Sequence, residues 1–287
     1  MNNIERLFGS GRDVPGMRPS GRIPARSVFE EIEAAAARAA EEAQVQLAPP
    51  HIAAEAVETP VPEEPLTGTE FPIALLDPLR PGAELLCAHD AAHPHSEKLR
   101  RLRTELLLRH TEQHGSIAIA VVGADAGEGR SRLAAELAIV FAQLGRSTLL
   151  LDADMRNSRQ HVLFGAEPRG GLAQVIENGD APTLFGVTGF PSLFLMTAGA
   201  CSSNPTELLS DGRFESLMEE LRKQFDFIIV DTPRFADYGD GQVIATIVGH
   251  VLTVHRARRT HYKAARAMLR QLSSARADVL GAVLNHF

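Results

Sequence analysis

The feature that most constrains the fold is an alternation of short apolar runs with helix-forming segments over residues 117–285. The runs lack the alternating polar positions of a strand exposed on one face, which indicates strands covered on both faces. Six runs are predicted as strands, at residues 117–124, 148–154, 192–198, 227–233, 250–256 and 278–285. Helices are predicted at about 130–144, 212–224, 239–248 and 260–275. This order predicts an α/β fold, a doubly wound and mainly parallel sheet with helices on both faces and ligands at the carboxyl ends of the strands.

Residues 1–95 differ in composition from this regular part. The first residues are rich in Gly, Pro and Arg, residues 28–47 are rich in Ala and Glu, and residues 48–72 are rich in Pro and Glu. Such segments are typical of disordered chain, except that the Ala/Glu stretch has high helix propensity. We expect a largely disordered N-terminal segment with one helix over 1–95, and a folded domain over 96–287. Whether the helix docks on a partner or only belongs to a linker is left open.

Charge and cysteine content exclude several classes of function. The chain has 29 basic and 36 acidic residues and a net charge of −7, so we do not expect it to bind nucleic acid. It has no apolar run of about 18 residues and no apolar core near its N-terminus, which predicts a cytoplasmic protein. Cys87 and Cys201 match no metal or redox spacing and are expected to be reduced thiols. The scattered histidines, among them His110, His161 and His255, show no ligand spacing.

A glycine-rich turn, "ADAGEGRS", follows the strand predicted at 117–124. In a phosphate-binding loop of this spacing, backbone N–H groups surround phosphate oxygens and a hydroxyl at the helix start ligates Mg²⁺. A glycine-rich turn is common in strand-to-helix connections, so the turn alone does not establish a phosphate-binding site and other residues must support that interpretation. The lysine usual in such a loop is replaced by Arg130. The predicted nucleotide-binding residues of the turn are Gly127, Glu128, Gly129, Arg130, Ser131 and Arg132.

Carboxylates at the ends of two other strands supply that support. Asp152 and Asp154 end the run "LLLDAD", and Asp231 ends "FIIVD". Charged residues that close apolar strands are costly unless they serve a purpose, and these lie at the edge of the sheet where the turn opens. A carboxylate there can hold Mg²⁺, and a second can orient the attacking group. The predicted Mg²⁺ ligands are Ser131, Asp152 and Asp231, and the predicted catalytic residues are Arg130, Asp152 and Asp154.

Together these segments resemble the Walker A, A′ and B motifs of the bacterial tyrosine kinases (BY-kinases), a MinD/ParA-like branch of the P-loop ATPases. The motifs are "GEGRS", "LLLDADMR" and "FIIVDTP", and "NPTELL" is similar to a further stretch of that family. The resemblance covers about residues 85–287. It implies that Glu97, Arg100 and Arg103, which fit E-x2-R-x2-R, form a contact between subunits of a ring. It also implies that Asn285 lies near the adenine.

The resemblance implies ATP or ADP and Mg²⁺ as ligands and a role in exopolysaccharide or capsule synthesis. The expected partners are a membrane polysaccharide copolymerase, which would recruit the chain to the inner face of the membrane, and further copies of this chain or a related kinase. The family phosphorylates a C-terminal tyrosine cluster. The only tyrosines here are Tyr238 and Tyr262, and neither belongs to such a cluster.

The replacement of lysine predicts that kinase activity is weak or lost. Lysine is a compact point charge, whereas arginine is planar and larger, so the exchange is not conservative at a phosphate site. Losing the lysine is expected to cost a factor of about 10³ or more in phosphoryl transfer. Two alternatives stay open: an active protein-tyrosine kinase that uses Arg130 in place of lysine, and a MinD/ParA-like positioning ATPase. Against the second, Asp125 stands where those proteins carry an extra lysine.

Overall fold

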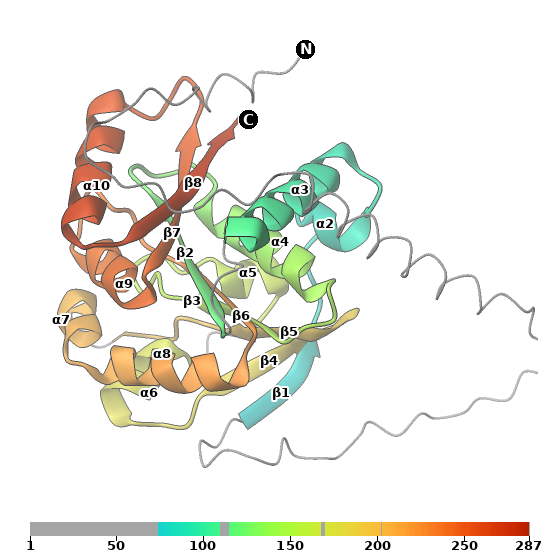
Figure 1. The fold of residues 1–287 in the computed structure, drawn as a ribbon. Coiled ribbons are helices and arrows are strands. Elements are labelled where there is room, and N and C mark those ends of the chain that lie inside the picture. Colours follow the sequence, from blue (N-terminus) through green and yellow to red (C-terminus); the bar gives the residue numbers. More distant parts are fainter. Residues whose placement is uncertain (1–73, 110–114, 168–169, 202, 287) are drawn as a thin grey trace, which may run out of the picture. The chain divides into compact units, whose positions relative to one another are not determined.

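The computed structural model describes residues 74–109, 115–167, 170–201 and 203–286, within a compact unit that spans Leu66–Phe287. The described strands form one eight-stranded sheet in the order β1-β4-β5-β3-β6-β2-β7-β8 (Figure 1). All neighbouring strands are parallel except β4 and β5, which are antiparallel. The strands are β1 (Ala74–Leu79), β2 (Ile117–Gly123), β3 (Thr148–Asp152), β4 (Thr183–Val187), β5 (Phe190–Met196), β6 (Phe227–Asp231), β7 (His250–Arg256) and β8 (Asp278–Asn285). The predicted α/β fold class is confirmed.

The helices lie between the strands along the chain. They are α2 (Leu86–His89), α3 (Pro94–Arg109), α4 (Arg130–Ala142), α5 (Gln160–Phe164), α6 (Leu172–Asn178), α7 (Pro205–Ser210), α8 (Arg213–Gln224), α9 (Asp240–Val248) and α10 (Tyr262–Ser274). Within the described part of the chain, no helix is both long enough and apolar enough to cross a bilayer.

The folded unit begins earlier in the chain than the boundary predicted at residue 96. Strand β1 pairs with β4 in the sheet, and α2 packs against α4, although both precede that boundary. Strand β1 was not predicted, because Asp77 and Pro78 interrupt its apolar pattern, which an edge strand tolerates. The helix predicted at 28–47 and the linker at 48–72 lie outside the described residues.

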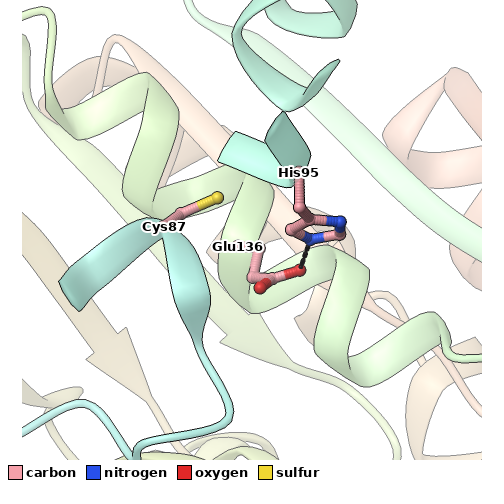
Figure 2. Close-up of side chains that lie close together, drawn as sticks. All are labelled: Cys87, His95 and Glu136. Atoms are coloured by element: carbon pink, nitrogen blue, oxygen red, sulfur yellow. Dashed lines mark hydrogen bonds and ion pairs between the residues drawn. The ribbon is translucent and has the colours of Figure 1, made fainter. Parts of the chain in front are cut away.

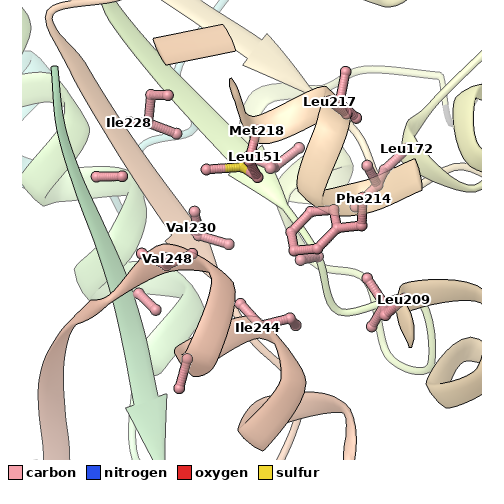
Figure 3. Close-up of a cluster of buried hydrophobic side chains, with 14 of the residues drawn as sticks. Leu151, Leu172, Leu209, Phe214, Leu217, Met218, Ile228, Val230, Ile244 and Val248 are labelled. Carbon is pink, nitrogen blue, oxygen red and sulfur yellow. The ribbon is translucent and has the colours of Figure 1, made fainter. Parts of the chain in front are cut away.

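Helices cover both faces of the sheet. Along β2 the side chains alternate: Ile119 and Val121 pack in the layer of α2 to α5, while Ala120 and Val122 pack in the layer of α6 to α10. Figure 3 shows the second layer, where Phe214 and its neighbours on α8 and α9 meet the strands. Two buried faces explain why the central strands β2, β3 and β6 are apolar at almost every position.

Strand order brings the polar strand ends together. Strand β6 lies between β3 and β2, and its last residue, Asp231, pairs in register with Asp152 of β3 and with Val121 of β2. All three strands are parallel, so the turn after β2 opens at the same edge of the sheet as the two carboxylates. This edge is where an open α/β sheet binds its ligands.

Candidate functional site

The glycine-rich turn connects β2 to α4 and has the backbone shape of an anion-binding loop. Gly127 and Gly129 have φ values of +71° and +89°, a left-handed conformation that residues with a side chain rarely adopt. Gly129 is the N-cap of α4 and has no side chain that could accept a hydrogen bond from the first N–H groups of the helix. The first N–H groups of α4 therefore face the mouth of the loop, where the helix dipole also favours an anion.

The loop is held in shape by its own glutamate. The Glu128 side chain is buried, and its Oε2 accepts a hydrogen bond from the Asp125 N–H at 3.0 Å, while Thr260 Oγ1 donates to Oε1. A Cβ atom at Gly123 would lie 2.3 Å from Glu128 Oε2, so a larger residue here would displace this carboxylate. Asn285 Nδ2 donates to the Glu128 carbonyl at 2.7 Å. Asn285 thus lies at the loop, and its predicted place near an adenine stays a prediction.

Arg130 is turned back onto the loop that carries it. Its Nη1 donates to the carbonyl oxygens of Gly123 at 3.2 Å and of Asp125 at 2.9 Å. Its Nε is buried and has no hydrogen-bond partner within the described residues. Arg132 points to Glu136 on the next turn of α4, with its Nη2 3.4 Å from Glu136 Oε1. The predicted roles of both arginines toward a nucleotide stay predictions.

Asp152 and Asp231 form a buried acidic pair. Both side chains are fully buried. The Oδ2 of Asp152 accepts hydrogen bonds from Ser158 Oγ at 2.8 Å and from the Gln160 N–H at 3.0 Å. Gln160 also donates through Nε2 to Asp231 Oδ2 at 2.8 Å and to the Ser131 carbonyl at 2.9 Å. Gln160, which was not among the predicted site residues, links both aspartates to the start of α4.

Burial raises the pKa of both carboxyls above the ordinary value for aspartate. For Asp152 the neighbouring Asp231 raises the pKa further, whereas hydrogen bonds from Gln160 and Ser131 and the charge of Arg130 partly offset the rise for Asp231. Asp231 Oδ1 is buried and has no partner among the described groups. Two adjacent buried carboxylates with an unused oxygen are costly unless a cation joins them.

The residues present fit a Mg²⁺ ion, which the P-loop resemblance implies. Mg²⁺ prefers carboxylate and hydroxyl oxygens, and here the unused Oδ1 of Asp231, the Asp152 carboxylate and the Ser131 hydroxyl supply them. The ion would neutralise charge on bound phosphates. The chain's own contribution is to position both carboxylates through Gln160 and to bury them away from water.

Asp154 and Arg156 organise the loop after β3. Asp154 is buried and its Oδ1 accepts from the Arg156 N–H at 3.2 Å, so the carboxylate closes a turn; its predicted catalytic role is untested. The Arg156 guanidinium forms an ion pair with buried Asp240 at 2.6 Å and lies 3.8 Å from the ring centre of Tyr238. It also donates to Asn204 Oδ1 at 3.2 Å. The stretch "NPTELL" is therefore joined to the loop after β3.

The predicted subunit-contact residues lie on α3 and bond within the chain. Arg100 pairs with Glu97 at 2.8 Å on the exposed side of the helix. Arg103 is partly buried and its Nη1 donates to the Val140 carbonyl of α4. Arg103 therefore fastens α3 to α4, and a contact between subunits stays a prediction for all three residues.

Comparison with known proteins places this site in a family. A family profile described as "Cellulose biosynthesis protein BcsQ" matches residues 117–277. The putative tyrosine-protein kinase CapB of Staphylococcus aureus is 32% identical over 191 residues, which cover 66% of this chain and 83% of CapB. The chain belongs to the bacterial tyrosine-kinase family.

Other BY-kinases agree with this assignment. The putative tyrosine-protein kinase EpsB of Ralstonia solanacearum is 33% identical over 223 residues, which cover 77% of this chain but only 30% of EpsB. The solved kinase domain of Escherichia coli tyrosine kinase ETK superposes with a TM-score of 0.66 at 29% identity, covering 70% of this chain and 79% of that domain. The chain thus spans most of CapB but less than one third of EpsB.

Proposed function

We propose that this BY-kinase homologue binds ATP or ADP with Mg²⁺ and regulates the chain length or export of an exopolysaccharide, with phosphoryl transfer weak or lost. In this role it would act at the inner face of the membrane beside a polysaccharide copolymerase, as an oligomer of its own chain or with a related kinase. Membership of the BY-kinase family supports the general role. The glycine-rich loop and the oxygens of Ser131, Asp152 and Asp231 support binding of a magnesium nucleotide.

The observation that carries the proposal is the position of Arg130. Its Nη1 is bonded to two carbonyl oxygens of the loop, and a planar guanidinium in this position is not the compact charge that lysine brings to the β- and γ-phosphates. Phosphoryl transfer depends on positioned charge, so the replacement lowers the rate of phosphoryl transfer more than it lowers nucleotide affinity. Nucleotide binding in the ground state depends on the backbone N–H groups of the loop and is retained.

Transfer of label from ATP tests this. Purified protein, the Arg130→Lys variant and an Asp152→Ala variant as background control are incubated with labelled ATP and Mg²⁺, and nucleotide affinity is measured in parallel. We expect the wild type to bind ATP and ADP but to turn over no more than the control, and Arg130→Lys to raise turnover. Equal turnover of wild type and Arg130→Lys, both well above the control, would contradict the assigned role of Arg130.

A second candidate is an active protein-tyrosine kinase in which Arg130 takes the role of the loop lysine in phosphoryl transfer. It is favoured by the unused, buried Nε of Arg130, which keeps one donor available in the loop. The exposed rings of Tyr238 and Tyr262 would be accessible substrates. Label on tyrosine in the wild type, above that of Asp152→Ala, would select this candidate and exclude the first.

A further inference from the structure

Three side chains with different metal-binding atoms lie together on the face of the sheet covered by α4. They are Cys87 of α2, His95 at the start of α3 and Glu136 of α4, and Figure 2 shows them pointing toward one another. Their sulfur, nitrogen and oxygen atoms all lie within 4.8 Å of one another. Cys87 and Glu136 are buried and His95 is partly exposed. No residue of this cluster belongs to the Walker-type motifs.

We propose that Cys87, His95 and Glu136 form a binding site for a divalent cation of the Zn²⁺ class. Thiolate, imidazole and carboxylate together are a donor set that Zn²⁺ accepts, whereas Mg²⁺ prefers oxygen ligands alone. Three protein ligands leave the fourth position of a tetrahedral ion to water, which the exposed side of His95 admits.

The surroundings of Glu136 orient one oxygen toward the cluster. Its Oε1 accepts from the Leu86 N–H at 3.0 Å and from Arg132 at 3.4 Å, while its Oε2 lies 2.6 Å from His95 Nε2. Leu86 and Arg132 thus hold Oε1 in the way that residues behind a metal ligand orient it. Oε2 remains available to bind the cation. On metal binding, the hydrogen bond between His95 Nε2 and Glu136 Oε2 is broken, and the neutral imidazole carries its single proton on Nδ1 instead.

Charge balance favours the metal complex in this buried place. A divalent ion with one thiolate, one carboxylate and one neutral imidazole has no net charge, so it avoids the cost of an unpaired buried charge. On binding, the Cys87 thiol loses its proton to solvent, and the sulfur–metal bond forms. Burial raises the pKa of the free Cys87 thiol to about 11, which keeps it protonated and unreactive until a metal displaces the proton.

The cation would fasten three helices together. Residues Cys87 and His95 flank the turn between α2 and α3, and Glu136 lies in the middle of α4, the helix that starts at the glycine-rich loop. Binding would therefore stabilise the attachment of α2 and of the first turn of α3 to the domain. That first turn includes Glu97, one of the predicted subunit-contact residues.

Cobalt substitution tests the site directly. The full-length protein is titrated with Co²⁺ in excess Mg²⁺, which occupies oxygen-only sites, and thiolate-to-cobalt charge-transfer absorption is recorded. We expect one equivalent of Co²⁺ per chain with this absorption, displaced by Zn²⁺. Cys87→Ser should lose the absorption, and Cys201→Ser, the matched control at the other cysteine, should retain it. Absence of the band in wild type, or its persistence in Cys87→Ser, would overturn the proposal.

A second variant guards against misfolding of Cys87→Ser. His95→Gln changes a partly exposed residue, and circular dichroism checks that it is folded. We expect Zn²⁺ to raise the thermal midpoint of the wild type, and His95→Gln to weaken Zn²⁺ affinity by more than about tenfold, the least that even an outer partner contributes. The control is His89→Gln, because the His89 ring bonds the carbonyls of Pro81 and Gly82 instead. Unchanged Zn²⁺ affinity in folded His95→Gln would remove His95 from the site and overturn the proposal.

Discussion

Replacing Asp231 by Asn is expected to stabilise the metal-free protein, because it removes one of two like charges that the fold buries together. Asp152 and Asp231 are register partners on neighbouring strands, which lie about 4.8 Å apart. At that separation and an effective dielectric of about 20, two ionised carboxylates repel by roughly 3 kcal/mol. The amide retains an oxygen for Gln160 and puts its NH₂ where Oδ1 has no described partner. We expect the free energy of unfolding at pH 8 to rise by about 1–3 kcal/mol.

The pH dependence follows from the raised pKa values of the pair. Both carboxyls have a higher pKa in the folded state than the ordinary value of about 4, so the wild type loses stability as the pH rises from that value through the folded pKa. The gain from Asp231→Asn should therefore be large at pH 8 and small at pH 5. Thermal unfolding in EDTA, followed by circular dichroism, should show a midpoint about 2–12 °C higher at pH 8.

A paired carboxylate provides the matched control. Arg146 forms an ion pair with Asp226 and holds the pKa of that carboxyl below its usual value, so Asp226→Asn should lower the thermal midpoint at pH 8. Mg²⁺ should raise the midpoint of the wild type but not that of Asp231→Asn. An Asp231→Asn variant less stable than wild type at pH 8, or with equal gains at both pH values, would refute this account of the pair.

Three further substitutions test other parts of the structure. Gly129→Ala places a side chain at φ +89°, which should cost about 1–2 kcal/mol in urea unfolding and weaken nucleotide binding by calorimetry. Arg156→Met leaves buried Asp240 without its ion pair and should lower urea stability by about 2–4 kcal/mol, whereas an unchanged midpoint would show the pair to be dispensable. Gly171→Ala puts a Cβ 2.4 Å from the Thr197 carbonyl, a backbone clash that should cost about 1–3 kcal/mol or more and reduce soluble yield.

The centre of the sheet could be predicted from the sequence because strands β2, β3, β6 and β7 are buried on both faces. Each of the six predicted apolar runs forms a strand of the sheet. A short run of consecutive apolar residues is typical of a strand that helices cover on both faces. The two missed strands, β1 and β4, lie together at one side of the sheet. Gly186 breaks the short apolar run of β4, and edge and near-edge strands carry a weaker apolar signal.

The site was predictable where its residues end strands and unpredictable where distant segments meet. The glycine loop, Asp152 and Asp231 follow apolar runs directly, so parallel strands alone bring them to one edge. Gln160 could not be predicted, because its contact with Asp231 joins positions 71 residues apart. The cluster around Cys87 shares this property: His95 and Glu136 are 41 residues apart, and no local spacing marks them as metal ligands.

The bracing of the loop by Glu128 bears on how fast a ligand can bind. With its buried carboxylate on the Asp125 N–H and its carbonyl on Asn285, the loop is ordered when the domain folds. The entropy of fixing these backbone torsions is therefore lost on folding and does not weaken a later binding step. A polyphosphate would bind to a loop that already has its binding conformation. Its association rate should therefore be limited by diffusion and electrostatic attraction and not by a slow rearrangement of the loop.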